Sequence, residues 1–364
     1  MPARLSRQLK LMSYWTMVAV VLIHAYNYTD TFLQPATRIA EGLRPGAVIE
    51  FFFSNALTRF ATPVFFIISG YLFFAGVQKL TASLYVRKIK SRVISLAVPY
   101  VFWVLLWSAA GMLLLGLFGS EGFPLLVEKL SGWPEGAFEG FYNLPLPFQF
   151  WYVKDLLKLA LMSPLIYLLA KKLKKYAVVL LALPWLMDFS VPHLPNTEGL
   201  LFFTLGAVLA VCGDEWGLTA ETRQQPRKAA LCFPACWIAA CAAYALMSAT
   251  AAETNVSDVV LTLMYRLCVI LGVVSVFVLY EFLPQRIRTM DSARLPASTF
   301  LLFAVHEPLQ HLVFQGVLLT ERLDAVHLLL YFGLPTAMML LCSGLSRLLK
   351  RFAPDFRSFV TGGR

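Results

Sequence analysis

The chain has 364 residues, of which 59% are hydrophobic and 14% are charged. So little charge excludes an ordinary soluble domain, in which about 25% of the residues are charged. The net charge of +10 would favour nucleic acid or another anionic partner in a soluble protein. Here its distribution follows membrane topology instead, and no nucleic-acid partner is expected.

Apolar segments recur along the chain and predict an all-α, polytopic membrane helix bundle of about 10 transmembrane helices. They cover residues 11–28, 47–76, 93–118, 148–170, 176–190, 199–213, 230–249, 258–280, 297–319 and 325–346. The fifth and sixth segments are shorter than the about 20 residues that a perpendicular helix needs. A tilted, re-entrant or paired arrangement therefore stays open for these two segments.

Basic residues predict the orientation of the helices. With a cytoplasmic N-terminus, most Lys and Arg residues outside the apolar segments fall in cytoplasmic loops, and the outer loops hold only Arg38, Arg44, Lys129 and Arg322. The positive-inside rule then places both termini in the cytoplasm. We expect a single transmembrane domain over residues 1–349 and a short basic cytoplasmic tail over 350–364.

The cysteines predict neither a disulfide nor a metal site. All six lie in or beside apolar runs, and none belongs to a C-x-x-C pair or stands at metal-ligand spacing from a histidine. Cys232 and Cys236 are one helical turn apart, which favours a packing stripe over a redox pair.

The first apolar segment ends in polar residues, among them His24, Tyr26 and Asn27, at its predicted outer end. A signal peptide is disfavoured because no small-residue cleavage site follows. A histidine hydrogen-bonded in the headgroup layer fits this position, and so does a catalytic histidine, which can exchange a proton near neutral pH.

Among the ionisable residues inside other apolar segments, where charge costs at least about 2.5 kcal/mol per residue on insertion scales, seven are candidates for a functional site. They are Arg59, Lys154, Asp155, Lys158, Arg266, His306 and Glu307. Their estimated depths, with that of His24, predict one polar cavity in the centre and outer half of the bundle. Structural ion pairs, such as Asp155 with Lys158, are the alternative interpretation.

Two further stretches allow a structural and a functional interpretation. Residues 85–92, YVRKIKSR, suit a cytoplasmic anchor, yet Lys88 and Arg92 share a helix face and suit the phosphates of a cytosolic donor. The long outer loop of residues 119–147 combines glutamates with aromatic residues. It fits either a solvated loop or a surface for a sugar-like acceptor.

Five stretches, agreeing in order and spacing, resemble the integral-membrane acyltransferase-3 family. The most specific is SNALTRFATPVFFIISGYLFF, in which Arg59 precedes a proline, paired phenylalanines and Ser-Gly-Tyr. The others are VAVVLIH, YVRKIKSRVISLAVPYVFW, FWYVKDLLKLALMSPLIYLL and FLLFAVHEPL. The chain departs from the family pattern at Ser13, where an arginine is usual, and at Gln149, where many members have a histidine before the residue matching Trp151.

The resemblance implies an O-acyltransferase of the bacterial cytoplasmic (inner) membrane. Such an enzyme moves an acyl group, commonly acetyl, from cytosolic acyl-CoA to a hydroxyl of an extracytoplasmic or lipid-linked glycan. Carried over residue by residue, it implies a catalytic His24 and the second-span Arg59. It also implies Lys88 and Arg92, with Lys90, near the CoA phosphates. His306 would be the late-span histidine, without an assigned role.

In the expected chemistry, His24 takes the proton from the acceptor hydroxyl or carries the acyl group itself, and Arg59 stabilises the oxyanion. The expected substrate cavity comprises Asn27, Trp151, Lys154, Asp155, Arg266, His306 and Glu307. The expected partners are acyl-CoA, the glycan or lipid-linked sugar acceptor and the lipid bilayer, with no bound cofactor. A transporter or exporter of a glycan or lipid, and an inert scaffold, are the alternatives.

Overall fold

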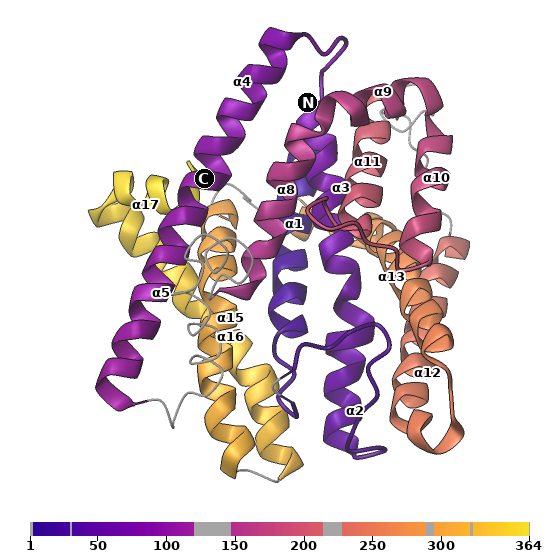
Figure 1. Ribbon diagram of the computed structural model, residues 1–364, viewed down its shortest axis with the longest axis vertical. Helices are drawn as coiled ribbons and strands as arrows, with labels where there is room; N and C mark the ends of the chain where they lie inside the picture. The colour runs from indigo at the N-terminus through magenta and orange to yellow at the C-terminus, as the bar shows by residue number, and fades with distance from the viewer. Residues whose placement is uncertain are drawn as a thin grey trace.

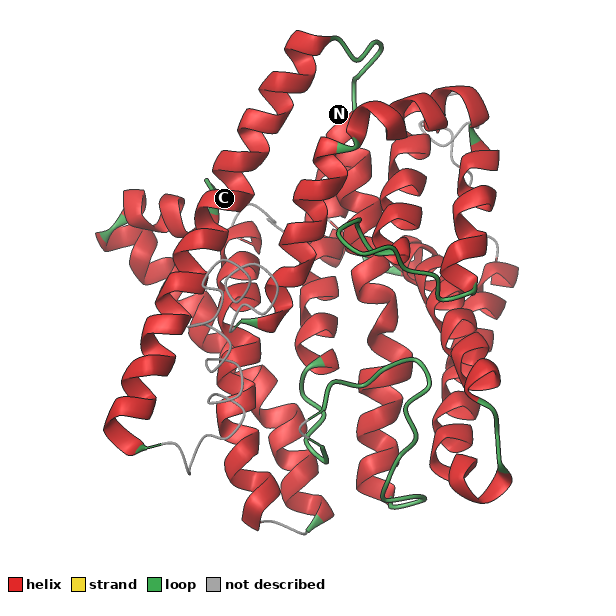
Figure 2. Ribbon diagram, in the orientation of Figure 1, coloured by secondary structure: helices red, strands yellow, loops and turns green. Residues whose placement is uncertain are grey.

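The computed structural model describes residues 3–29, 31–119, 147–213, 228–288, 295–320 and 323–363. Within these ranges every regular element is a helix (Figure 2), as the composition predicts. Most of the long outer loop, residues 120–146, with its glutamates and aromatic residues, lies outside the described residues.

The helices follow the predicted apolar segments in order (Figure 1). They are α1 (Ala3–Ile23), α2 (Pro45–Phe51), η1 (Phe52–Ala56), η2 (Leu57–Phe60), α3 (Ala61–Phe74), α4 (Ala82–Arg92), η3 (Val93–Ala97), α5 (Val98–Phe118), η4 (Phe148–Phe150), α8 (Trp151–Leu161), α9 (Ser163–Leu173), α10 (Lys175–Leu186), α11 (Thr197–Cys212), η6 (Lys228–Leu231), α12 (Cys232–Thr254), α13 (Asp258–Phe282), α14 (Gln285–Arg288), α15 (Leu295–Thr320), α16 (Asp324–Phe352) and α17 (Pro354–Thr361).

Five helical stretches of the described chain are long and apolar enough to cross a membrane. They are Pro45–Phe74, Ala82–Leu117, Lys228–Thr254, Asp258–Phe282 and Asp324–Phe352. The protein is therefore an all-helical membrane protein. The count of about ten spans and the cytoplasmic position of both termini stay predictions.

The second apolar segment forms one long helical stretch with an irregular centre. Between α2 and α3 the chain makes the π-helical turn η1 and then the 3₁₀ turn η2. Such turns change the direction in which the following side chains point, and they are frequent at functional sites. Arg59 lies in η2, directly after the π-helical turn.

Two glycines allow α3 and α11 to approach closely. A Cβ atom added at Gly70 would collide with the backbone of Phe203, and one added at Gly206 would collide with the backbone of Ile67. Small residues at a helix interface permit this kind of backbone contact in membranes. The pairing attaches α11 firmly to the helix that follows Arg59.

One side of the bundle is built from short helices. α10 has 12 residues and α16 has 29, which correspond to about 18 Å and about 44 Å of helix. Figures 1 and 2 show the loop between α10 and α11 crossing the bundle at about half its height. Of the arrangements that the sequence leaves open for the fifth and sixth segments, the structure adopts a pair of short helices.

The C-terminal residues continue the helical structure. α16 extends to Phe352, and α17 packs against α5, where the Trp103 indole nitrogen donates to the carbonyl of Val360 at 2.9 Å. Val360 and Thr361 are buried. The predicted tail, residues 350–364, therefore contains a packed helix, and its cytoplasmic location stays a prediction.

Candidate active site

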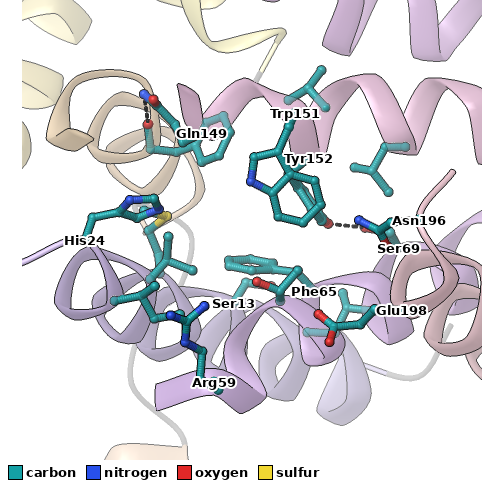
Figure 3. A pocket seen from close by; sticks show the side chains of 18 of the residues that line it. Ser13, His24, Arg59, Phe65, Ser69, Gln149, Trp151, Tyr152, Asn196 and Glu198 are labelled. Atoms are coloured by element: carbon teal, nitrogen blue, oxygen red, sulfur yellow. Dashed lines mark hydrogen bonds between the residues drawn. The ribbon is translucent and has the colours of Figure 1, made fainter. Parts of the chain in front are cut away.

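A cavity of about 920 Å³ runs alongside α1. The lining residues of α1, with His24 directly after its end, extend from Ser6 to His24, a distance of about 27 Å along a helix. We divide it into a basic arm (Ser6, Lys10, Arg92, Leu96), a central chamber (His24, Phe32, Arg59, Phe148, Gln149) and a lateral arm (Trp185, Asp188, Asn196, Glu198, Arg266). Figure 3 shows His24 at one end of the view, Glu198 and Asn196 at the other, and Trp151 and Phe65 between them.

His24 follows the last turn of α1, where the Ala25 N–H donates to the carbonyl of Leu22 at 3.2 Å. Side chains from three distant elements supply further donors to the last carbonyls. Ser54 Oγ and Tyr331 Oη donate to the carbonyl of Leu22 at 2.7 and 3.2 Å, and Gln310 Nε2 donates to the preceding carbonyl at 3.2 Å. The backbone beside His24 is therefore held by η1, α15 and α16.

The imidazole of His24 is half-buried among other rings. Its centroid lies 5.3 Å from that of Phe32, 6.5 Å from that of Phe148 and 5.1 Å from that of His306. The two imidazoles meet at 67°, edge to face. The chamber thus presents His24 to the cavity from an apolar and aromatic surround.

His306 is fully buried behind His24 and does not line the cavity. Its Nδ1 lies 3.0 Å from the carbonyl oxygens of Leu302 and Phe303. Because carbonyls only accept hydrogen bonds, Nδ1 carries the proton and Nε2 is the accepting nitrogen of the neutral ring. That Nε2 is buried and has no hydrogen-bond partner among the described residues.

Pro308 explains the polar contacts around this part of α15. Proline lacks an N–H, so the carbonyl of Ala304, four residues earlier, has no helical donor. Trp107 Nε1 and Gln149 Nε2 donate to it at 2.9 and 3.3 Å, and Gln149 Nε2 also lies 3.0 Å from the carbonyl of Phe303. Gln149 therefore links the wall of the chamber to α15 behind it.

Arg59 is buried in the central chamber and is held by backbone oxygens. Its Nε donates to the carbonyl of Ser54 at 3.0 Å, and its NH2 donates to that of Leu33 at 2.7 Å. The guanidinium lies 4.9 Å from the centroid of Phe32, the ring that also contacts His24. No carboxylate of the described chain lies within 4 Å of Arg59, so no ion pair there balances the charge of this buried cation.

The three basic residues predicted near CoA occupy different environments. Arg92 lines the basic arm of the cavity, whereas Lys90 is exposed on α4. Lys88 Nζ donates to the carbonyl of Phe73 at 2.5 Å, at the C-terminal end of α3. A cation there satisfies an unpaired carbonyl and interacts favourably with the helix dipole, so Lys88 has a structural contact of its own.

A family model for an acyltransferase domain matches residues 8–347, nearly the whole chain. The chain belongs to the acyltransferase-3 family. With its apolar spanning helices, the protein is a membrane acyltransferase. No curated protein and no solved structure matches the chain.

Some of the residues that the sequence predicts in the cavity of this acyltransferase line it, and others do not. Trp151 and Arg266 line the cavity with His24, Arg59 and Arg92. The predicted residues that do not line it are Asn27, Lys88, Lys90, Lys154, Asp155, His306 and Glu307. His306 nevertheless touches His24 from behind, and the functional roles of all these residues stay predictions.

Two of the residues outside the lining form structural contacts. Asn27 is buried, its N–H donates to Glu50 Oε2 at 3.1 Å, and its side chain donates to the carbonyl of His327 at 3.1 Å. Asp155 accepts from Lys158 at 3.2 Å and from the backbone of Asn196 at 3.0 Å. These contacts join the segment after α1 to α2 and α16, and α8 to the loop before α11.

The sequence interpretation missed several ionisable residues of the acyltransferase. Glu50 is fully buried within the second apolar segment, where a single carboxylate was a detectable signal. Asp188 and Glu198 line the lateral arm from either end of the loop between α10 and α11. Their signal was weaker, because each stands at the edge of a short apolar segment and resembles an ordinary loop carboxylate.

Proposed function

We propose that this membrane acyltransferase transfers an acetyl group from cytosolic acetyl-CoA to a hydroxyl of an extracytoplasmic or lipid-linked glycan, and that it works in the bacterial cytoplasmic membrane. The observation that carries the proposal is the continuous cavity that connects Lys10 and Arg92 with His24. Such a cavity suits a donor whose charged part stays at one face while its reactive carbon is delivered to the centre of the bundle.

The donor's phosphates would bind at the basic arm. Arg92 offers a planar guanidinium that matches phosphate oxygens, and Lys10 adds a second cation. Ser13, where the family usually has an arginine, lies one turn from Lys10 on the same lined face of α1. Lys10 can therefore supply the positive charge that Ser13 lacks.

The acyl transfer would take place in the central chamber. His24 accepts the proton of the acceptor hydroxyl, whose oxygen attacks the thioester carbonyl carbon. Arg59 stabilises the negative charge on the carbonyl oxygen of the tetrahedral intermediate. The carbon–sulfur bond then breaks, the ester remains on the acceptor, and the CoA thiolate receives the proton from His24.

The test is transfer of label from radiolabelled acetyl-CoA to an envelope glycan fraction, catalysed by the full chain in proteoliposomes. His24→Ala removes the base, so the label should fall to background at matched expression. Arg38→Gln is the control, because Arg38 pairs with Asp258 outside the cavity lining. Equal silence of the wild type and His24→Ala with acetyl, propionyl and succinyl donors would sink the enzyme proposal and favour transport.

A further inference from the structure

The lateral arm is a polar branch that the proposed chemistry at His24 does not use. Its centre is Arg266, whose NH2 lies 2.5 Å from Asp188 Oδ1 and whose NH1 lies 3.7 Å from Glu198 Oε2. The Arg266 side chain is 6% exposed, whereas that of Asp188 is 70% exposed. The arm therefore leads from a buried guanidinium to an open mouth at Asp188.

Aromatic rings and neutral polar groups complete the walls. The Arg266 guanidinium lies 4.7 Å from the centroid of Trp185, whose Nε1 donates to Glu198 at 3.4 Å. Trp151 and Tyr152 line the stretch between the arm and the chamber (Figure 3), and the Tyr152 hydroxyl lies 3.2 Å from Ser69 Oγ. Rings beside a few convergent polar groups are typical of small-molecule sites.

Water must reach the mouth of the lateral arm at Asp188. The residues of the α10–α11 loop from Met187 to Leu194 are exposed, although the loop crosses the bundle at half its height (Figure 2). Irregular backbone at membrane depth is tolerated only where it is buried in protein or lines a water-filled cavity. The short helices α10 and α11 therefore border an aqueous vestibule that leads to the lateral arm.

The charges of the arm restrict what can bind there. Among the residues that define the arm, two carboxylates, Asp188 and Glu198, lie beside one guanidinium, Arg266, so an anionic ligand would meet carboxylate oxygens that repel it. Carboxylate oxygens accept strong hydrogen bonds from hydroxyl groups. The arm thus suits an uncharged, hydroxyl-rich ring better than a uronate or a phosphosugar.

We propose that the lateral arm is the acceptor subsite and that it selects an uncharged sugar ring, with Asp188 and Glu198 as the specificity-determining residues. The inference rests on the proposed acetyl transfer and names the acceptor class for the same cavity. In this arrangement the donor comes through the basic arm and the acceptor through the vestibule, and the two meet at His24.

The experiment compares two acceptors that differ in charge, p-nitrophenyl glucoside and p-nitrophenyl glucuronide, with labelled acetyl-CoA and the full chain in proteoliposomes. The wild type should favour the glucoside. Asp188→Asn and Glu198→Gln each remove a negative charge, so the glucuronide-to-glucoside ratio of kcat/KM should rise roughly tenfold per lost charge-assisted contact. The KM for acetyl-CoA should not change.

Asp258→Asn is the matched control, because Asp258 is an exposed carboxylate that pairs with Arg38 away from the cavity. A purely structural ion pair would lower transfer to both glycosides equally, and an unchanged ratio in both variants would overturn the inference. So would His24-dependent labelling of the envelope glycan together with no labelling of either glycoside by the wild type. If no His24-dependent labelling of any acceptor occurs, the proposed function itself fails.

Discussion

At the scale of single residues, Gln149 stands where many family members have a histidine, and its amide makes contacts of its own. Its side-chain amide donates to two carbonyls of α15. Its Oε1 is buried and has no partner among the described residues, although Gln149 lines the central chamber. The amide can therefore support α15 and still offer an acceptor atom to a substrate.

We predict that Gln149→Leu costs about 0.5–1.5 kcal/mol of unfolding free energy, because the amide donor is lost while His306 Nδ1 and Trp107 Nε1 still contact the two carbonyls. It should also lower the kcat of acetyl transfer while leaving the KM for acetyl-CoA unchanged. Thermal unfolding in detergent and steady-state transfer assays measure the two effects.

Trp107→Phe is the comparison for Gln149→Leu. It removes a donor to the same Ala304 carbonyl, but Trp107 does not line the cavity. It should cost similar stability and spare kcat. An equal loss of kcat in both variants would mean that Gln149 acts only through the stability of α15.

At the scale of elements, the packing of α4 beside α3 gives Arg92 and Lys88 different surroundings. Arg92 reaches the cavity from the last turn of α4, while Lys88, one turn earlier, satisfies the C-terminal end of α3. Helical spacing alone placed both residues on one face. The position of α3 gave them different partners.

We predict that Arg92→Gln raises the KM for acetyl-CoA without lowering thermal stability, because a phosphate contact is lost. Lys88→Gln should lower thermal stability and change that KM little, because a helix-end contact is lost. Arg87→Gln, at an exposed position of the same helix outside the cavity lining, is the control and should change neither quantity. A higher KM in Lys88→Gln, equal to that in Arg92→Gln, would contradict this division of roles.

The irregular helical stretch from α2 to α3 determines where Arg59 lies. Its π-helical and 3₁₀ turns place Arg59 beside Phe32 in the chamber, with the Arg59 side chain bonded to the carbonyls of Ser54 and Leu33. Apolar periodicity predicted a helix here and correctly included Arg59 as a buried cation. It could not predict the π-helical turn, because that turn depends on how the helix packs against its neighbours.

At the scale of the whole molecule, the helices differ in length. α12, α13 and α16 have 23, 25 and 29 residues, while α10 and α11 leave their connecting loop at about half the height of the bundle (Figure 1). In the proposed reaction, the cavity receives the donor along α1 and the acceptor over this loop.

We predict that Ser190→Cys, in the α10–α11 loop, reacts with a membrane-impermeant maleimide added from outside, because water reaches the vestibule. Leu340→Cys should remain unlabelled, because its exposed side chain lies near the middle of α16 and faces lipid, where a reactive thiolate does not form. Labelling of intact cells, with the wild-type cysteines as background, measures the difference. Reaction of Ser190→Cys from the cytoplasmic side alone would reverse the predicted orientation.

The sequence by itself determined the helical membrane class, the order of the helices and a set of polar residues in or at the ends of apolar segments that includes His24, Arg59 and Arg266. These follow from local properties: apolar runs of membrane length, and charges where charge is costly. The family resemblance added the expected activity, and the family match bears out an acyltransferase.

Only the tertiary structure decided which of these residues meet. Asp188 and Arg266 are 78 residues apart in the chain, and Gln310 caps α1 from 289 residues away. Such contacts depend on how helices pack and how deeply each one reaches, which hydropathy along the chain does not encode. For the same reason the sequence did not place His306 behind His24, remove Asn27 from the cavity lining, or include Asp188 and Glu198 in it.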